Sequence, residues 1–367
     1  MASLLVPPPY SLPDHYDGWQ LSWKFLVFRP AILRVQACLL LALLVYAGLS
    51  LYGKTANARK ADRFYSVVLP LFSQQFSKPT SGLVSDGPSD FFVFSTGRRA
   101  ISSLHTVLAL RPRHDLLQFI WQYLWSAYDL RYEPFDALTF DFTLGSDAAA
   151  ATPDFIWAVM RKSELTVIRD QRWDLQTFTR TANHPGLDST LSVMSEFADV
   201  TETLVKLAPS RDSTPLLTLI SSALPYLRVF SITDQPEERP SASALATKSK
   251  RVILTFDLPD DAQGVNRILP LLEGTFALVD LLATGRVTFR PETRAKIRKI
   301  REDVEKTVKE EEEKEKREEV LEDRRSAKRK AEEERFAKLG AADQKKALER
   351  ERKRALKKSQ GKLVRKV

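Results

Sequence analysis

The sequence predicts an α+β protein in which a single transmembrane helix precedes a cytosolic mixed α/β domain and a long, charged, coiled-coil-like helical arm. Three observations support this fold class. Residues 35–53 form an uncharged apolar run, residues 60–290 mix alternating and helical apolar patterns, and residues 291–367 are dominated by Glu, Lys and Arg. At 367 residues, the chain is long enough for two domains.

The apolar run reads VQACLLLALLVYAGLSLYG at residues 35–53. Its length corresponds to roughly 28 Å of α-helix, close to the ~30 Å hydrocarbon core of a bilayer. Tyr46 and Tyr52 lie toward its C-terminal end, and aromatic rings favour the membrane interface. A transmembrane helix is favoured over a buried core helix or a cleaved signal peptide, because the run is long and begins well inside the chain.

Basic residues flank the run on both sides and are more numerous after it. Because basic flanks tend to stay in the cytosol, we expect a single-pass protein with a cytosolic C-terminus. The expected parts are a short luminal N-terminus (1–34), the transmembrane helix (35–53), a cytosolic α+β domain (60–290) and a basic helical arm (291–367).

Four small residues in the run, Ala42, Ala47, Gly48 and Ser50, would allow close packing of a partner helix. They are equally compatible with ordinary lipid-facing positions, so both interpretations stay open. The run contains no charge and therefore cannot relay protons or conduct ions by itself.

Residues 60–290 alternate between strand and helix patterns. The predicted strands are 90–95, 135–144, 227–232 and 251–256. The predicted helices are 100–110, 115–128, 161–178, 189–207, 216–227 and 268–284. Residues 155–160 form another apolar run, and residues 237–250 read as a surface loop. Ser189 and Thr190 are expected to cap the helix at 189–207.

The body carries no motif typical of catalysis or of metal binding. The sequence has no Gly-rich phosphate loop and no paired cysteines, and its single Cys38 is expected to be a packing residue. His114-Asp115 could be mistaken for a metal-phosphohydrolase dyad, but no further His and Asp ligands accompany it, so we expect the start of a surface helix. The sequence therefore predicts a non-enzymatic protein without a metal or cofactor.

The net charge of the chain is concentrated in the arm. Residues 291–367 hold 28 Lys and Arg against 19 Asp and Glu, which accounts for the whole formal charge of +9. Within the arm, residues 291–339 are nearly balanced, with 17 basic and 16 acidic residues, whereas residues 341–367 hold 11 basic and 3 acidic residues. We expect the balanced part to set the reach of the arm and the basic end to make a contact.

Pro291 suits the first turn of a helix that continues to about Leu339. Three pairs place Glu four residues before a basic residue, and each would add about 0.2–0.5 kcal/mol to an exposed helix. These pairs are Glu310–Lys314, Glu312–Lys316 and Glu313–Arg317. A short apolar stripe, Ile297, Ile300, Val304 and Val308, favours docking of the helix base over a sustained coiled coil, although both stay open. Gly340 predicts a break before a second helix at 344–359.

Nine basic side chains in the arm's end are the predicted phosphate contacts. They are Arg350, Arg352, Lys353, Arg354, Lys357, Lys358, Lys362, Arg365 and Lys366. Phe336 is the arm's only aromatic residue, so structured RNA bound through its backbone is favoured over stacking on single-stranded bases. A solvated tail and binding to anionic lipid remain alternatives.

Short motifs along the chain occur in the order seen in a known family. They are NARK (57–60), STGR (95–98), RHDLL (113–117), LSVMSE (191–196), TFDLP (255–259) and LPLL (269–272). From about Tyr52 to Val367, the chain resembles the coiled-coil domain-containing protein 47 family, the larger subunit of the endoplasmic-reticulum PAT complex.

The resemblance implies an endoplasmic-reticulum membrane adaptor or chaperone subunit that assists insertion and folding of multi-span membrane proteins at the ribosome-bound translocon. The implied partners are an Asterix-like small membrane protein, the Sec translocation channel, the ribosome through its RNA, nascent multi-span membrane proteins and membrane lipids. Animal relatives have a long acidic luminal region associated with calcium binding, which we do not expect here. The alternative is a membrane-anchored scaffold or tether whose arm binds lipid or a partner coiled coil.

Overall fold

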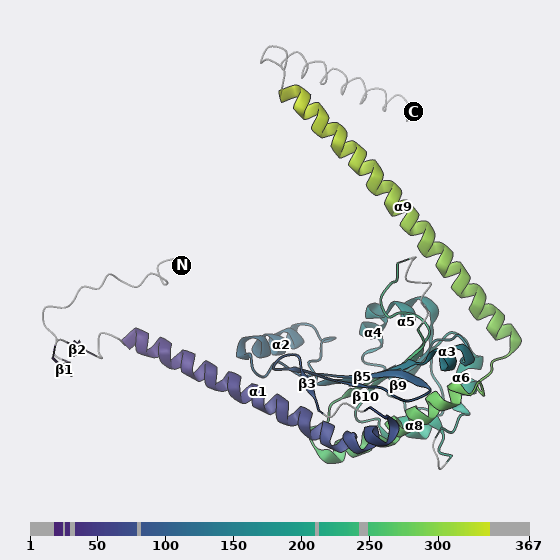
Figure 1. Cartoon of the computed structure of the whole chain (residues 1–367), viewed down its shortest axis with the longest axis horizontal. Helices are drawn as coiled ribbons and strands as arrows, with labels where there is room; N and C mark the ends of the chain where they lie inside the picture. Colours follow the sequence, from purple (N-terminus) through teal and green to yellow (C-terminus); the bar gives the residue numbers. More distant parts are fainter. Residues whose placement is uncertain are drawn as a thin grey trace. The chain divides into compact units, whose positions relative to one another are not determined.

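A computed structural model describes residues 18–24, 26–29, 34–78, 82–209, 213–241 and 249–337 (Figure 1). The chain divides into two compact units. The first consists of Met1–Glu238 with Ser249–Arg294, and the second of Arg239–Lys248 with Ala295–Val367.

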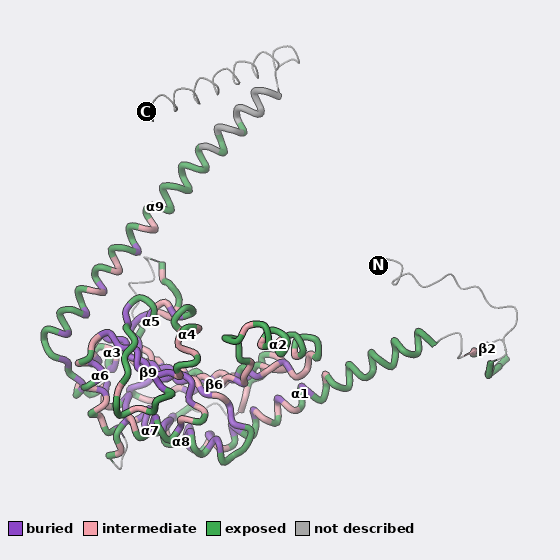
Figure 2. Tube along the Cα trace, turned by 180° about the vertical axis from the view of Figure 1, so that it is seen from behind, coloured by how far each residue is buried: buried purple, intermediate pink, exposed green. Residues whose placement is uncertain are grey.

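Helix α1 (Arg34–Gln75) lies in the first unit, contains the predicted apolar run and continues from it into the folded body. Its first half is exposed, whereas its second half buries a stripe that includes Asn57, Ala61, Phe64 and Val68 (Figure 2). The helix is therefore much longer than the predicted span at 35–53, because its second half is a core element of the folded body. A two-stranded hairpin, β1 (Leu21–Trp23) and β2 (Leu26–Phe28), precedes it.

The centre of the first unit is a sheet that has nine strands in the described residues, with all neighbours antiparallel. In spatial order the strands are β3 (Val84–Ser85), β4 (Asp90–Ser95), β5 (Ile101–Ala109), β6 (Ala137–Leu144), β11 (Arg251–Asp257), β10 (Leu227–Thr233), β7 (Trp157–Arg161), β9 (Leu191–Ser195) and β8 (Arg180–Ala182).

One face of the sheet is covered by α8 (Ala262–Ala283) and the second half of α1 (Figure 1). Aromatic rings fill the space between these layers. The ring of Phe140 on β6 lies 6.2 Å from that of Phe64 and 6.4 Å from that of Phe72, both on α1. Phe142 contacts Phe276 of α8 at 5.2 Å. Tilted and edge-to-face contacts of this kind add to the stabilisation from burial of the rings.

The remaining helices of this unit are short, and α4 and α5 lie on the sheet face opposite α8 (Figure 1). They are α2 (Leu116–Tyr128), α3 (Ser146–Ala151), α4 (Leu165–Gln171), α5 (Trp173–Phe178), α6 (Ala198–Val205) and α7 (Leu216–Ser222).

The structure confirms the mixed fold class and most of the predicted elements. The strands predicted at 90–95, 135–144, 227–232 and 251–256 correspond to β4, β6, β10 and β11, and the apolar run at 155–160 falls largely in β7. The helix predicted at 115–128 is α2. The helix predicted at 268–284 is α8, which begins earlier because Asp261 caps it by accepting a 3.1 Å hydrogen bond from the Gly264 amide.

The helix predicted at 100–110 is wrong, because these residues form strand β5 between β4 and β6. Leu104, Thr106 and Leu108 are buried on one face and alternate with less buried residues. This alternation is hard to recognise in the sequence, because Leu and Ala in the segment also favour a helix. These residues form a strand because they pair with β4 on one side and with β6 on the other.

The helix predicted at 189–207 is also wrong in its first half. Residues 191–195 form β9, in which all five residues are buried, and only Ala198–Val205 are helical. Thr190 is not a helix cap, since its hydroxyl donates to Asp188 at 2.8 Å just before the strand. A short, fully buried apolar run cannot be assigned to strand or helix from periodicity alone.

Two further predicted helices are too long. The segment 161–178 is broken at Arg172, whose extended backbone (φ −107°, ψ 106°) separates α4 from α5. The segment 216–227 is helical only to Ser222, and Leu227 already pairs in β10. In the predicted loop at 237–250, residues 242–248 lie outside the described residues.

The second unit contains the greater part of α9 (Pro291–Ala337), a 47-residue helix that begins at Pro291 as predicted. Two of the three predicted pairs are ion pairs in the described part of α9: Glu312–Lys316 at 3.5 Å and Glu313–Arg317 at 3.4 Å. Ile297 and Val308 of the apolar stripe are buried. The predicted break at Gly340 and the helix at 344–359 lie outside the described residues.

Candidate membrane junction and sheet cleft

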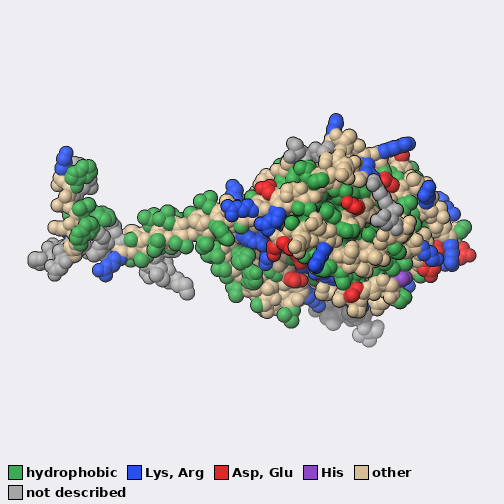
Figure 3. Space-filling view, turned by 90° about the horizontal axis from the view of Figure 1, so that it is seen from below, with side chains coloured by type: hydrophobic (Ala, Val, Ile, Leu, Met, Phe, Trp, Pro, Cys, Tyr) green, Lys and Arg blue, Asp and Glu red, His purple; other side chains and the backbone are tan. Residues whose placement is uncertain are grey.

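The first half of α1 exposes its apolar side chains on every side. Leu39, Leu43 and Leu51 are all more than 60% exposed, and hydrophobic side chains line this part of the helix in Figure 3. In the described part of the chain, α1 is the one helix that is long and apolar enough to cross a membrane, and none of its apolar window is buried. A helix with apolar residues all round its surface is suited to lipid.

The four small residues proposed for helix packing do not share one face of α1. Ser50 is half-buried and lies in helical register with Tyr46, Gly53 and Asn57, which face the body. Gly48 lies on the other side, and nothing is within 4 Å of a Cβ placed there. Ala42 and Ala47 are also exposed. Packing of a partner helix therefore stays a prediction, and Gly48 is its most open position.

Where α1 enters the body, it is held by the segment that precedes α2. The Nδ2 of Asn57 donates to the carbonyl oxygens of Arg111 (3.0 Å) and Pro88 (3.2 Å), and its Oδ1 accepts from Arg113 (2.9 Å). Asn57 is fully buried, so these hydrogen bonds replace the water that its amide loses. The contact fixes α1 against the body at the end of the apolar run.

Asp136, just before β6, is the centre of an ionic cluster at this junction. Its carboxylate accepts from Lys60 at 2.6 Å, from the side chain of Arg113 at 2.7 Å and from the Arg111 backbone at 2.8 Å. Burial of Asp136 acts to raise its pKa. The hydrogen bonds from Arg113, Arg111 and Lys60 outweigh burial and hold the pKa of this carboxyl well below its usual range.

Sequence reasoning missed this cluster, although Lys60 and Arg113 lie in two of the short motifs, NARK (57–60) and RHDLL (113–117), that carry the resemblance described above. In the sequence, Asp136 is simply one residue of the strand predicted at 135–144. Nothing in a single sequence shows that residues separated by 76 positions meet.

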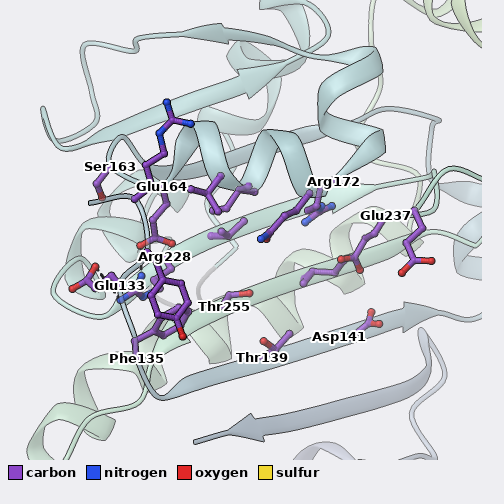
Figure 4. A pocket seen from close by; sticks show the side chains of 18 of the residues that line it. Glu133, Phe135, Thr139, Asp141, Ser163, Glu164, Arg172, Arg228, Glu237 and Thr255 are labelled. Carbon is purple, nitrogen blue, oxygen red and sulfur yellow. Dashed lines mark hydrogen bonds and ion pairs between the residues drawn. The ribbon is translucent and has the colours of Figure 1, made fainter. Parts of the chain in front are cut away.

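A cleft of about 840 Å³ lies on the sheet face opposite α8, between the sheet and α4 (Figure 4). Strands β6, β10 and β11 form its floor, with Thr139, Asp141 and Thr255 pointing into it. The aliphatic residues Val167 and Ile168 of α4 line the other side. The cleft therefore has a polar floor and a partly apolar wall, which suits binding of a ligand or a chain segment.

Arg228 closes one end of the cleft and is only 1% exposed. Its guanidinium carbon lies 3.4 Å from the centre of the Phe135 ring, and its nitrogens lie 2.5 Å from Glu164 and 3.3 Å from Asp257. Burial raises the pKa of Glu164, and the charge of Arg228 opposes this effect. The guanidinium thus combines cation–π stacking with ion pairing, a combination that lysine cannot reproduce.

Several charged side chains that line the cleft form ion pairs. Arg251 lies 3.2 Å from Asp141, and Arg172 lies 2.6 Å from Asp174. Paired, hydrogen-bonded charges restrict the geometry of these side chains. Within the described residues, no group of three or more His, Cys, Asp or Glu side chains could hold a metal ion.

The structure places only some of the predicted site residues. Asp115 is the N-cap of α2 and accepts hydrogen bonds from the amides of Leu117 and Gln118, as expected for the start of a surface helix. Cys38 is exposed on α1, so it is not a buried packing residue within this chain. The nine predicted RNA-binding residues, from Arg350 to Lys366, lie outside the described residues.

Two comparisons with known proteins show what this chain is similar to. Residues 33–358 match the family described as PAT complex subunit CCDC47. The chain is also 25% identical over 336 residues to the UPF0674 endoplasmic reticulum membrane protein C2G5.01 of Schizosaccharomyces pombe, which covers 88% of this chain and 85% of that protein. These findings support a role in the endoplasmic reticulum membrane. Because the family match spans most of the chain, this protein belongs to the PAT complex subunit CCDC47 family.

Proposed function

We propose that this protein is a non-catalytic subunit of the endoplasmic reticulum membrane that assists insertion and folding of multi-span membrane proteins at the ribosome-bound translocon. The single observation that carries the proposal is the family match over residues 33–358. The match includes the apolar run, the mixed body and the arm as far as Lys358.

The proposed topology is single-pass, with the body and the arm in the cytosol. The basic flank after the apolar run supports this orientation. So does the charge of the arm's end, because its anionic partners, RNA and anionic headgroups, are on the cytosolic side. The partners in this proposal are an Asterix-like small membrane protein, the Sec channel, the ribosome and nascent multi-span proteins.

The arm is the proposed contact with ribosomal RNA. Its 47-residue helix α9 is about 70 Å long at 1.5 Å per residue. The pairs along α9, such as Lys309–Glu305 at 2.6 Å, are typical of an exposed single helix. A helix of this kind is suited to carrying the basic end at 341–367 toward a phosphate backbone.

The test is co-sedimentation of the purified, detergent-solubilised full chain with ribosomes. One variant replaces the nine basic residues of the end with Gln. A matched control replaces nine basic residues between 291 and 339. We expect the first variant to lose binding and the control to retain most of it. Wild-type binding should weaken steeply between about 50 and 200 mM salt. Unchanged sedimentation of the first variant would contradict the RNA contact.

Flotation of the same proteins with liposomes containing anionic lipid tests the tether alternative. Loss of flotation by the first variant, with ribosome binding intact, would favour a tether. The family-based role has a separate test, because it predicts that a small multi-span membrane protein co-purifies with the chain in mild detergent. That result does not depend on the arm.

A further inference from the structure

Helix α2 (Leu116–Tyr128) exposes an apolar and aromatic face that the folded body does not cover. None of its 13 residues is buried. Leu117, Trp121, Leu124 and Tyr128 are 72%, 62%, 61% and 83% exposed, and their spacing places them on one stripe of the helix. Figure 2 shows α2 largely exposed beside the entry of α1 into the body. An exposed stripe of this size marks an interaction surface.

The composition of α2 is that of a membrane interface. The segment LLQFIWQYLWSAY carries no charge and contains two Trp and two Tyr residues. Trp121 and Trp125 stack with ring centres 6.1 Å apart, and Trp125 contacts Tyr128 at 5.6 Å. Trp and Tyr combine an apolar ring with a hydrogen-bonding group, and they concentrate where hydrocarbon meets headgroups.

Contacts with α1 fix the position of α2 along the axis of α1, and therefore its depth relative to the apolar run. Tyr46 lies within the apolar run and donates a 3.3 Å hydrogen bond to Asp115, the N-cap of α2. Gly53, at the end of the run, packs against the backbone of Arg113. Tyr46 and Gly53 are about 10 Å apart along the helix axis. The start of α2 is therefore fixed within about 10 Å of the point where α1 leaves the apolar region, which is the depth of interfacial helices.

From these observations we infer that α2 is a second membrane contact of this protein, an interfacial helix whose apolar stripe inserts into the leaflet from which α1 emerges. A bilayer that surrounds residues 35–53 meets α2 because the Tyr46–Asp115 and Gly53–Arg113 contacts hold the two helices at one level. The occupant of the exposed stripe is lipid. The inference depends on α1 crossing the membrane and not on the ribosome contact.

Tryptophan quenching by brominated lipid tests this inference on the full chain. The protein is reconstituted into vesicles of phosphatidylcholine and phosphatidylethanolamine, with bromine either near the headgroup or deep in the acyl chain. Trp19 and Trp23, which precede α1 in the chain, also contribute fluorescence, so the test compares variants rather than absolute signals. We expect the double variant Trp121→Phe/Trp125→Phe to lose a component that is quenched more strongly by the shallow bromine.

Trp173→Phe, in α5, is the matched control and should leave the quenched component unchanged. Adding Tyr128→Trp to the double variant should restore quenching, because residue 128 lies on the same stripe. Near-ultraviolet circular dichroism confirms that the variants are folded. If the double variant is quenched in the same proportion as the wild type, Trp121 and Trp125 do not contact lipid. The stripe would then be a surface for a protein partner, and the inference would be wrong.

Discussion

The Nζ of Lys60 lies 2.6 Å from the Oδ2 of Asp136, so an ion pair links α1 to the start of β6. Asp136 is only 2% exposed, and Arg113 shares its carboxylate at 2.7 Å. The helix that carries the apolar run is thus fixed to the central sheet by charge as well as by its aromatic face. Substitutions in this cluster should therefore lower the free energy of unfolding of the body.

We expect Asp136→Asn to destabilise the body by about 3 kcal/mol, because it leaves Lys60 and Arg113 without their buried counter-charge. The control is Asp260→Asn. Asp260 also pairs with Lys60, at 2.5 Å, but it is 88% exposed, so its loss should change the unfolding free energy by less than about 1 kcal/mol. Denaturant unfolding in mild detergent measures both values. Equal effects of the two substitutions would contradict the central role of Asp136.

The same carboxylate predicts a direction of pH dependence. The pKa of Asp136 is lower in the folded state than its ordinary value of 3.8. Its ionised form therefore contributes stability that is complete above that value and is lost as the pH falls below it. The difference in melting temperature between the wild type and Asp136→Asn should be constant from about pH 7 to 5 and should narrow below about pH 4. A gap that widens in acid would contradict this assignment.

Two glycines of α1 should respond in opposite ways to the same substitution. A Cβ at Gly53 would overlap the carbonyl oxygen of Arg113 and lie 2.6 Å from the His114 nitrogen, whereas a Cβ at Gly48 meets nothing. We expect Gly53→Ala to cost about 1–3 kcal/mol through overpacking. Gly48→Ala should be neutral or slightly stabilising, because alanine favours the helix. Thermal melting in detergent compares the two variants, and equal melting temperatures would argue against the close contact at Gly53.

Gly48 also allows a test of helix packing in the membrane. Gly48→Leu should leave the fold intact but reduce co-purification of a small membrane partner, since close approach of helices requires small residues. Leu43→Ala, at another exposed position, is the control and should retain the partner. If Gly48→Leu retains as much partner as the wild type, this face of α1 is not the packing surface.

Arg228→Lys should destabilise the body by about 2 kcal/mol, because lysine cannot stack on Phe135 while also bridging Glu164 and Asp257. Arg290→Lys is the matched control. Arg290 pairs with Asp199 but is 75% exposed, so the same substitution there should have little effect. Chemical denaturation of both variants provides the comparison. A stable Arg228→Lys protein would show that the stacked geometry is not required.

Much of the fold could be predicted from local patterns, and the errors have physical causes. Strands β4 and β6 were found because their apolar residues alternate, and α9 because it is rich in helix formers. Strand β5 was misread because leucine and alanine suit both structures, and β9 because a buried run of five residues has no visible period. Both segments are strands because they pair with neighbouring strands in the folded sheet, and a single sequence does not show this pairing.

The functional surfaces were less accessible to sequence reasoning. The helical pattern of α2 was recognised, but an apolar stripe does not show whether it faces a core or the outside. The Asp136 cluster joins residues from three separate segments, and the cleft around Arg228 depends on the order of strands in the sheet. Spatial neighbours of this kind follow from topology and not from spacing along the chain.

The course of α1 from the apolar run into the body has a mechanical consequence. Roughly 24 Å of the same helix continues from Gly53 to Leu69 into the body, before Pro70 interrupts its hydrogen bonding. A rigid rod of this kind transmits its tilt directly. In a thinner bilayer, a span of fixed length tilts to match the hydrocarbon thickness, and the attached sheet must rotate with it. Membrane thickness would therefore set the angle at which the body faces its partners.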